Sequence, residues 1–110
     1  MRIPADAVIA AEKLTRYLLR PRPWDDKSGF LGQVGFSTEN PAELETAIRA
    51  MTVAHDAIED GINEYGTFYR VEGDIDGPDG RSLQVVLIWL PWKLDGTFHF
   101  VTLKPRKTKL

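Results

Sequence analysis

Few side chains in this sequence could transfer a proton near neutral pH. There are two histidines, His55 and His99, and imidazole is the side chain that titrates in this range. His55 lies on the apolar side of a predicted helix, where it could be a general base or a core-edge residue with one satisfied nitrogen. His99 lies within a predicted strand, where it could be a general acid or a half-buried sheet residue.

Three further residues could hold a phosphoryl group. Lys27 lies near the start of a predicted short helix, where it could bind an anion or simply be a solvated lysine. Thr102 and Lys104 alternate along a predicted strand, which places them on one face with Phe98 and Phe100. Beside a lysine, Thr102 could donate a hydrogen bond to a phosphoryl oxygen, or it could serve only as a strand former.

Basic and aromatic residues near both ends of the chain could bind RNA. Arg16 belongs to an N-terminal helix, whereas Arg106 and Lys107 belong to a basic C-terminal segment. The formal net charge is −2, so these cations would act locally or form only a solvated tail. Trp92 lies at a strand end, where it could stack on a base, pack in the core or contact a partner.

The composition excludes several kinds of site. The sequence has no cysteine, which excludes disulfides, thiolate nucleophiles and cysteine-ligated metals. It has no glycine-rich phosphate loop and no His-Glu-x-x-His helix, and we expect no metal or other cofactor. The apolar stretch at residues 7–11 is too short for a signal peptide or a membrane span. We therefore expect a cytoplasmic protein with no membrane partner.

Two helices are predicted before residue 40. Leu14, Tyr17 and Leu18 have the apolar spacing of a helix over residues 10–20, which the following prolines would end. A capping aspartate at position 25 or 26 predicts a short second helix, and Gly35 suits its left-handed end.

A third, longer helix has the clearest local signal. Asn40, Pro41 and Glu43 are typical of the N-cap, the first position and the third position of a helix. Apolar residues continue along one face for four turns and include His55, and the Asp60-Gly61 pair predicts the end of the helix.

The hydrophobic period changes to that of strands from Tyr65 onward. Strands are predicted over residues 65–73, 83–90 and 97–103, separated by glycine-containing turns. These elements predict an α+β fold, in which N-terminal helices pack on one face of a C-terminal twisted antiparallel sheet of three to four strands.

The chain length predicts one domain over residues 1–110. Residues 1–61 would form its mainly helical part, residues 62–105 its antiparallel sheet and residues 106–110 a basic tail.

Six stretches together resemble a small uncharacterised bacterial family similar to toxin domains of the barnase–EndoU–colicin–RelE superfold, which includes RelE/ParE-like proteins. The stretches are KLTRYLLRP at 13–21, DKSGFL at 26–31, VGF at 34–36, YGTFY at 65–69, GPDGR at 77–81 and FVT at 100–102, followed by Pro105. Members of that superfold are mostly metal-independent ribonucleases.

The resemblance implies candidate catalytic residues. Lys27 matches a lysine after the first helix, although Asp26 replaces the usual glycine. His55 matches a histidine that ends the long helix, and Thr102 matches a threonine in the last strand. Lys104 stands where the family pattern has a tyrosine.

Two functions are consistent with the sequence. The first is a ribonuclease toxin in which His55 is the base, Lys27, Lys104 and Arg106 offset phosphoryl charge, and Thr102 orients the phosphoryl group. Its partners would be RNA and a small acidic antitoxin or immunity protein. The second is a non-catalytic antitoxin, immunity or assembly protein that uses the sheet face as an interface. Either function is compatible with a homodimer.

Overall fold

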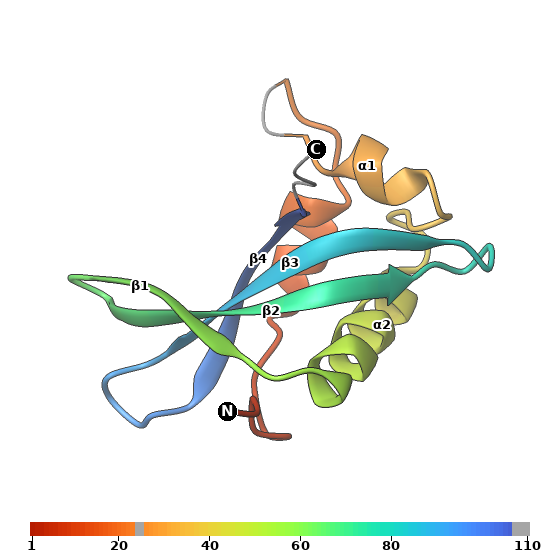
Figure 1. The fold of residues 1–110 in the computed structure, drawn as a ribbon. Coiled ribbons are helices and arrows are strands. Elements are labelled where there is room, and N and C mark those ends of the chain that lie inside the picture. The colour runs from red at the N-terminus through yellow and green to blue at the C-terminus, as the bar shows by residue number, and fades with distance from the viewer. Residues whose placement is uncertain (24–25, 107–110) are drawn as a thin grey trace.

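The fold is the expected α+β arrangement of N-terminal helices and a C-terminal antiparallel sheet (Figure 1). The structure, a computed structural model, describes residues 1–23 and 26–106. The elements in chain order are η1 (Lys13–Leu18), α1 (Ser28–Gly32), α2 (Pro41–Ala54), β1 (Ile58–Asn63), β2 (Gly66–Asp76), β3 (Ser82–Pro91) and β4 (Phe98–Pro105). The four strands pair in sequence order, and every pairing is antiparallel.

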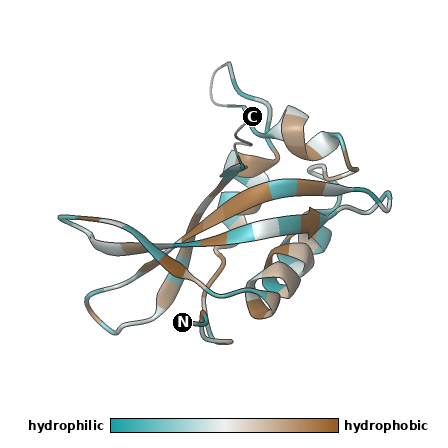
Figure 2. Cartoon of the chain, viewed as in Figure 1, coloured by the Kyte–Doolittle hydropathy of each residue, from teal (hydrophilic) through white to brown (hydrophobic). Residues whose placement is uncertain are grey.

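The helices and the inner face of the sheet enclose one hydrophobic core. Leu18 of η1 and Ile48 of α2 are fully buried, as are Val71 of β2 and Leu87 of β3. Apolar colour runs along much of β3 in Figure 2, in keeping with its position between β2 and β4. Among the residues described here, no helix has the length and apolar character needed to cross a bilayer.

The long helix begins where predicted but ends earlier. Pro41 occupies the first turn, while the Asn40 side chain binds the preceding loop, accepting from Ser37 N at 2.7 Å and donating to Gly35 O at 2.9 Å. The expected end at Asp60-Gly61 is wrong, because the helix stops at Ala54 and His55 is extended.

Residues beyond the helix form β1, which the sequence does not reveal. Every β1 residue is exposed, and its sequence, IEDGIN, does not alternate between apolar and polar residues. It is ordered by pairing with β2, from Ile58 opposite Arg70 to Asn63 opposite Gly66. The pairing depends on tertiary context rather than on hydrophobic patterning.

A β-bulge in β4 changes which residues face the core. Trp89 pairs with Phe100 and Ile88 pairs with Thr102, which leaves Val101 without an opposite residue. Phe100 and Leu103 are therefore both buried. The prediction of strict alternation, with Phe100 and Thr102 on one face, is wrong because the extra residue reverses the pattern.

Strand β2 is paired on both sides over only part of its length. β3 pairs with residues 69–76, whereas β1 pairs only with residues 66–70. In Figure 1, α2 lies along the half of β2 that β1 leaves unpaired. This arrangement leaves a groove between α2 and the unpaired half of β2.

Candidate functional site

Three polar side chains from distant segments meet at the edge of the sheet. The Lys27 Nζ donates to the Tyr17 hydroxyl at 3.2 Å. The Tyr17 hydroxyl lies 3.2 Å from Thr102 Oγ1, and either atom could donate. Arg22 adds a second cation, because its guanidinium carbon lies 4.8 Å from the centre of the Tyr17 ring. We refer to Tyr17, Arg22, Lys27 and Thr102 as the Tyr17 cluster.

Local structure positions each member of the Tyr17 cluster. η1 is a π-helix, in which Leu19 N donates to Leu14 O at 2.9 Å, and such turns are frequent at functional sites. Its leucines enter the core, and Tyr17 packs partly buried against that core. Because β4 is an edge strand, the Tyr17 hydroxyl can reach Thr102.

Asp26 orders the loop that carries Lys27. Its Oδ1 accepts from Ser28 Oγ at 2.6 Å and from Ser28 N at 2.9 Å. These two bonds lower the pKa of Asp26 below its ordinary value, and the bond from the Ser28 hydroxyl has the larger effect. Asp26, which stands where the related pattern has a glycine, therefore holds the start of α1.

Thr102 of the Tyr17 cluster lies on the outer face of the sheet, which is the face opposite the helices. Arg70, Ile88 and Thr102 form one cross-strand row. The next row along the strands contains Val86 between Glu72 and Lys104, so Lys104 shares this face with Thr102. The structure therefore brings Lys27, Thr102 and Lys104 to one region of the sheet.

Glu72 binds two of the cations on the outer face. Its Oε2 accepts from Arg70 Nε at 2.7 Å, and its Oε1 lies 3.2 Å from Arg106 Nε. The hydrogen bond from Arg70, followed by Coulombic attraction from both arginines, lowers the pKa of Glu72 below its ordinary 4.5. Much of the Arg106 charge is thereby offset within the chain.

This pairing predicts a pH-dependent contribution to stability. The folded-state pKa of Glu72 lies below the unfolded value, so its contribution is present above about pH 4.5 and is lost as the pH falls through the folded-state pKa. Glu72→Gln should lower the free energy of unfolding by up to about 1 kcal/mol at pH 7 and by less at pH 3. Urea unfolding at both values measures this, and an equal loss at the two would contradict it.

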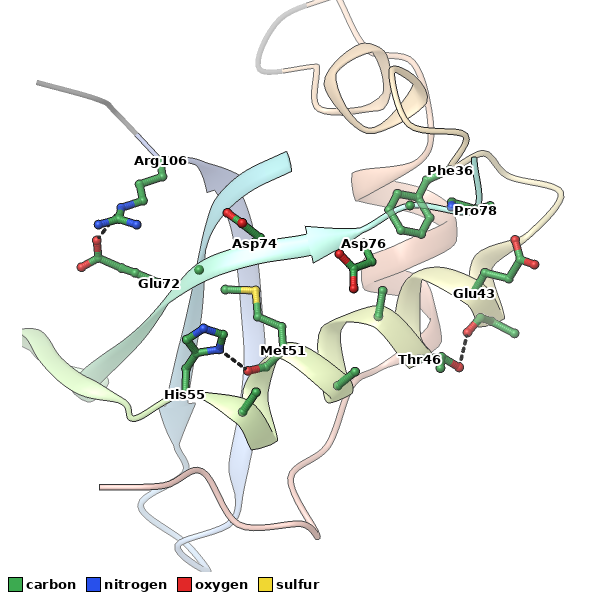
Figure 3. Close-up of a pocket in the computed structure, with 16 residues that line it drawn as sticks. Phe36, Glu43, Thr46, Met51, His55, Glu72, Asp74, Asp76, Pro78 and Arg106 are labelled. Atoms are coloured by element: carbon green, nitrogen blue, oxygen red, sulfur yellow. Dashed lines mark hydrogen bonds and ion pairs between the residues drawn. The ribbon is translucent and has the colours of Figure 1, made fainter. Parts of the chain in front are cut away.

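His55 lies apart from the Tyr17 cluster. Its Nδ1 is 2.9 Å from Met51 O, and its ring lies over Gly73 of β2, where an added Cβ would be 2.8 Å from Nε2 (Figure 3). Thr102 is on β4, with β3 between. The structure therefore does not bring together all of the expected catalytic residues, because helix α2 ends beside β2.

The expected RNA-binding residues are also dispersed. Arg16 is exposed on η1, and Arg106 pairs with Glu72. Trp92 is 49% exposed, and its ring stacks on His99 with the centroids 3.6 Å apart. His99 is therefore held by an aromatic contact rather than by the Tyr17 cluster. Lys107 lies outside the described residues.

Sequence reasoning missed two members of the Tyr17 cluster. Tyr17 lies on the apolar stripe of its helix, which indicates a core residue and hides the role of its hydroxyl. Arg22 lies between two prolines, and no local pattern links it to an aromatic ring. Within residues 1–23 and 26–106, no three acidic, histidine or cysteine residues are grouped to hold a metal ion.

The fold and site define a small α+β domain with a polar cluster at an edge strand. Residues 4–107 match the model of a domain of unknown function, DUF6883. The chain therefore belongs to the DUF6883 family. Comparison with curated protein sequences gives no match.

A solved structure has a similar fold. It is a chain of a contact-dependent growth inhibition toxin–immunity protein complex from Klebsiella pneumoniae 342, with a TM-score of 0.67 and 19% sequence identity. The match covers 91% of this chain and 100% of that chain. At this identity the likeness describes the fold alone.

Proposed function

We propose that this domain is a toxin that cleaves RNA by metal-independent attack of a ribose 2′-hydroxyl. The observation that carries the proposal is the hydrogen-bonded series of Lys27, Tyr17 and Thr102, which joins a cation, a phenol and a hydroxyl from three segments. These are the groups that phosphoryl transfer without a metal requires, namely positive charge and proton carriers. Support also comes from the similar chain, which belongs to a toxin–immunity protein complex.

In the proposed reaction the 2′-oxygen attacks the adjacent phosphorus and the bond from phosphorus to the 5′-oxygen breaks. The 2′-hydroxyl proton passes to solvent water, and the leaving 5′-oxygen takes the Tyr17 hydroxyl proton, which water replaces. The products are a 2′,3′-cyclic phosphate and a free 5′-hydroxyl. Lys27 offsets the negative charge that develops on the phosphoryl oxygens, and Thr102 donates a hydrogen bond to one of them.

Other cations would hold the flanking phosphates. Lys104 is exposed on the outer face two residues from Thr102, and Arg22 lies beside the Tyr17 ring. Phosphate contacts of this kind position RNA without reading its sequence. His55, the base expected from the sequence, lies outside the Tyr17 cluster, so we assign it no step.

A second candidate is a non-catalytic immunity or other protein-binding role. It is favoured by the pairing of Arg106 with Glu72, which reduces the positive charge available to RNA on the outer face. The similar chain's complex contains both a toxin and an immunity protein, so that likeness is consistent with either role.

The deciding experiment incubates the purified protein with transfer RNA in excess EDTA. We expect fragments that carry 2′,3′-cyclic phosphate and 5′-hydroxyl ends, together with slower bacterial growth when the protein is produced without a partner. Intact RNA and normal growth would reject the toxin and leave the binding role.

A further inference from the structure

A groove runs between α2 and the unpaired half of β2. Its volume is about 940 Å³, and residues of both elements line it (Figure 3). From α2 the lining includes Ala47, Ala50 and Ala54, which leave room beside the helix because their side chains are short. Met51 and the His55 ring lie toward β2 in the same view. We call this feature the edge groove.

One wall of the edge groove is an unpaired strand edge. Gly77 N donates to Arg81 O across the β2–β3 hairpin, which sets the alternation of main-chain hydrogen bonds along β2. By that alternation the N–H and C=O groups of Glu72, Asp74 and Asp76 point away from β3. In the described part of the chain, no strand pairs with this edge at residues 71–76. Such an edge is a template for another strand.

The length of the unpaired edge suits one extended segment. Six strand residues span roughly 20 Å at about 3.3 Å per residue, and a paired strand needs about 4.8 Å beside β2. A helix in the groove would leave the main-chain groups of β2 without hydrogen-bond partners, whereas a strand would satisfy them.

The acidic residues in the lining of the edge groove determine which kind of segment it can bind. Its lining includes the acidic residues Glu43, Glu72, Asp74 and Asp76 and one arginine, Arg106. Because Glu72 is paired with Arg70 and Arg106, the excess of acidic charge comes from Glu43, Asp74 and Asp76. A second copy of the chain would set the same carboxylates against each other, because antiparallel pairing of identical edges is symmetric. A positively charged segment is therefore favoured over self-association.

We infer that the edge groove receives an extended, lysine- or arginine-bearing segment of a partner protein, which pairs with β2 as an added strand. The inference goes beyond RNA cleavage and does not depend on it. Alternate side chains of the bound segment would face the α2 alanines, and the others would face the carboxylates.

The test uses a fluorescent, end-blocked Lys-Val-Lys-Val-Lys-Val peptide and the whole protein. We expect saturable binding, with amide NMR shifts concentrated at Glu72, Asp74 and Asp76. A second peptide has the same sequence but is N-methylated at the alternate residues whose N–H groups would bond to β2. It should bind at least 10-fold more weakly, since it lacks those main-chain donors. Equal binding of the two peptides would show mere charge attraction and overturn the inference.

Protein variants provide the matched controls. Ala50 is exposed on α2, so Ala50→Arg should fold normally yet fill the groove and weaken peptide binding at least 10-fold. Glu64→Lys makes a charge reversal in the β1–β2 turn, outside the groove lining, and should leave binding unchanged. Unaltered binding to Ala50→Arg, or a stable dimer of the wild-type protein that excludes the peptide, would reject the proposal.

Discussion

Replacing Lys27 with alanine is expected to slow RNA cleavage by roughly 10²- to 10³-fold, the usual cost of removing one donor that stabilises a developing oxyanion. Lys27 donates to the Tyr17 hydroxyl and lies 5.4 Å from the ring centre, so the variant loses the lysine charge of the Tyr17 cluster. Single-turnover cleavage of transfer RNA in EDTA measures the effect. The loss should fall mainly on the cleavage rate rather than on RNA affinity.

Two variants make this result specific. Lys93→Ala also removes a lysine, but Lys93 Nζ donates to Glu64 O in the β1–β2 turn, away from the Tyr17 cluster, and cleavage should remain within about 2-fold of wild type. Tyr17→Phe keeps the packed ring and removes the hydroxyl, and it should lose at least about 10²-fold if that group transfers a proton. Cleavage by a folded Lys27→Ala protein at the wild-type rate would refute the assignment.

Gly77→Ala is expected to be the most destabilising single methyl addition among the described glycines. A Cβ at Gly77 would collide with Val34 O, and with the Val34 Cβ and Cγ2 at 2.5 Å. That carbonyl also accepts from Asp79 N at 3.2 Å, so the loop after α1 cannot move freely. Overpacking of this kind costs about 1–3 kcal/mol or more. Urea unfolding followed by circular dichroism measures the loss.

Gly29→Ala is the matched control. A Cβ at Gly29 would meet nothing within 4 Å, and the residue lies inside α1. Alanine in a helix is favoured over glycine by about 1 kcal/mol, so this variant should be neutral or slightly stabilised. A Gly77→Ala protein as stable as Gly29→Ala would mean that the hairpin and the α1 loop separate without cost.

Local residue patterns were sufficient to predict the fold class. Asn40 and Pro41 predicted the start of α2, and the change of hydrophobic period near Tyr65 predicted the sheet. Gly80 and Gly96 occupy turns with φ of +88° and +74°, conformations that other residues rarely adopt. These features depend on residues close together in the chain, so the sequence expresses them directly.

Other features arise only when distant segments meet. Pairing with β2, not its own pattern, makes β1 a strand, and one bulge residue in β4 reverses the expected burial around Phe100. The family resemblance places His55 and Thr102 in one site, but His55 lies over β2 and Thr102 is on β4, with β3 between them. Tyr17, rather than His55, lies beside Lys27. Because β4 is an edge strand, the hydroxyl of the core-packed Tyr17 ring can contact Thr102 on the outer face.

The sequence by itself determined the fold class, the start of α2 and the existence of strands β2, β3 and β4, because periodicity and turn chemistry are local properties. The tertiary structure alone decided which polar groups share a site and which strand edge stays open. Those outcomes depend on strand register and on contacts between residues as far apart as Tyr17 and Thr102, which no local pattern encodes.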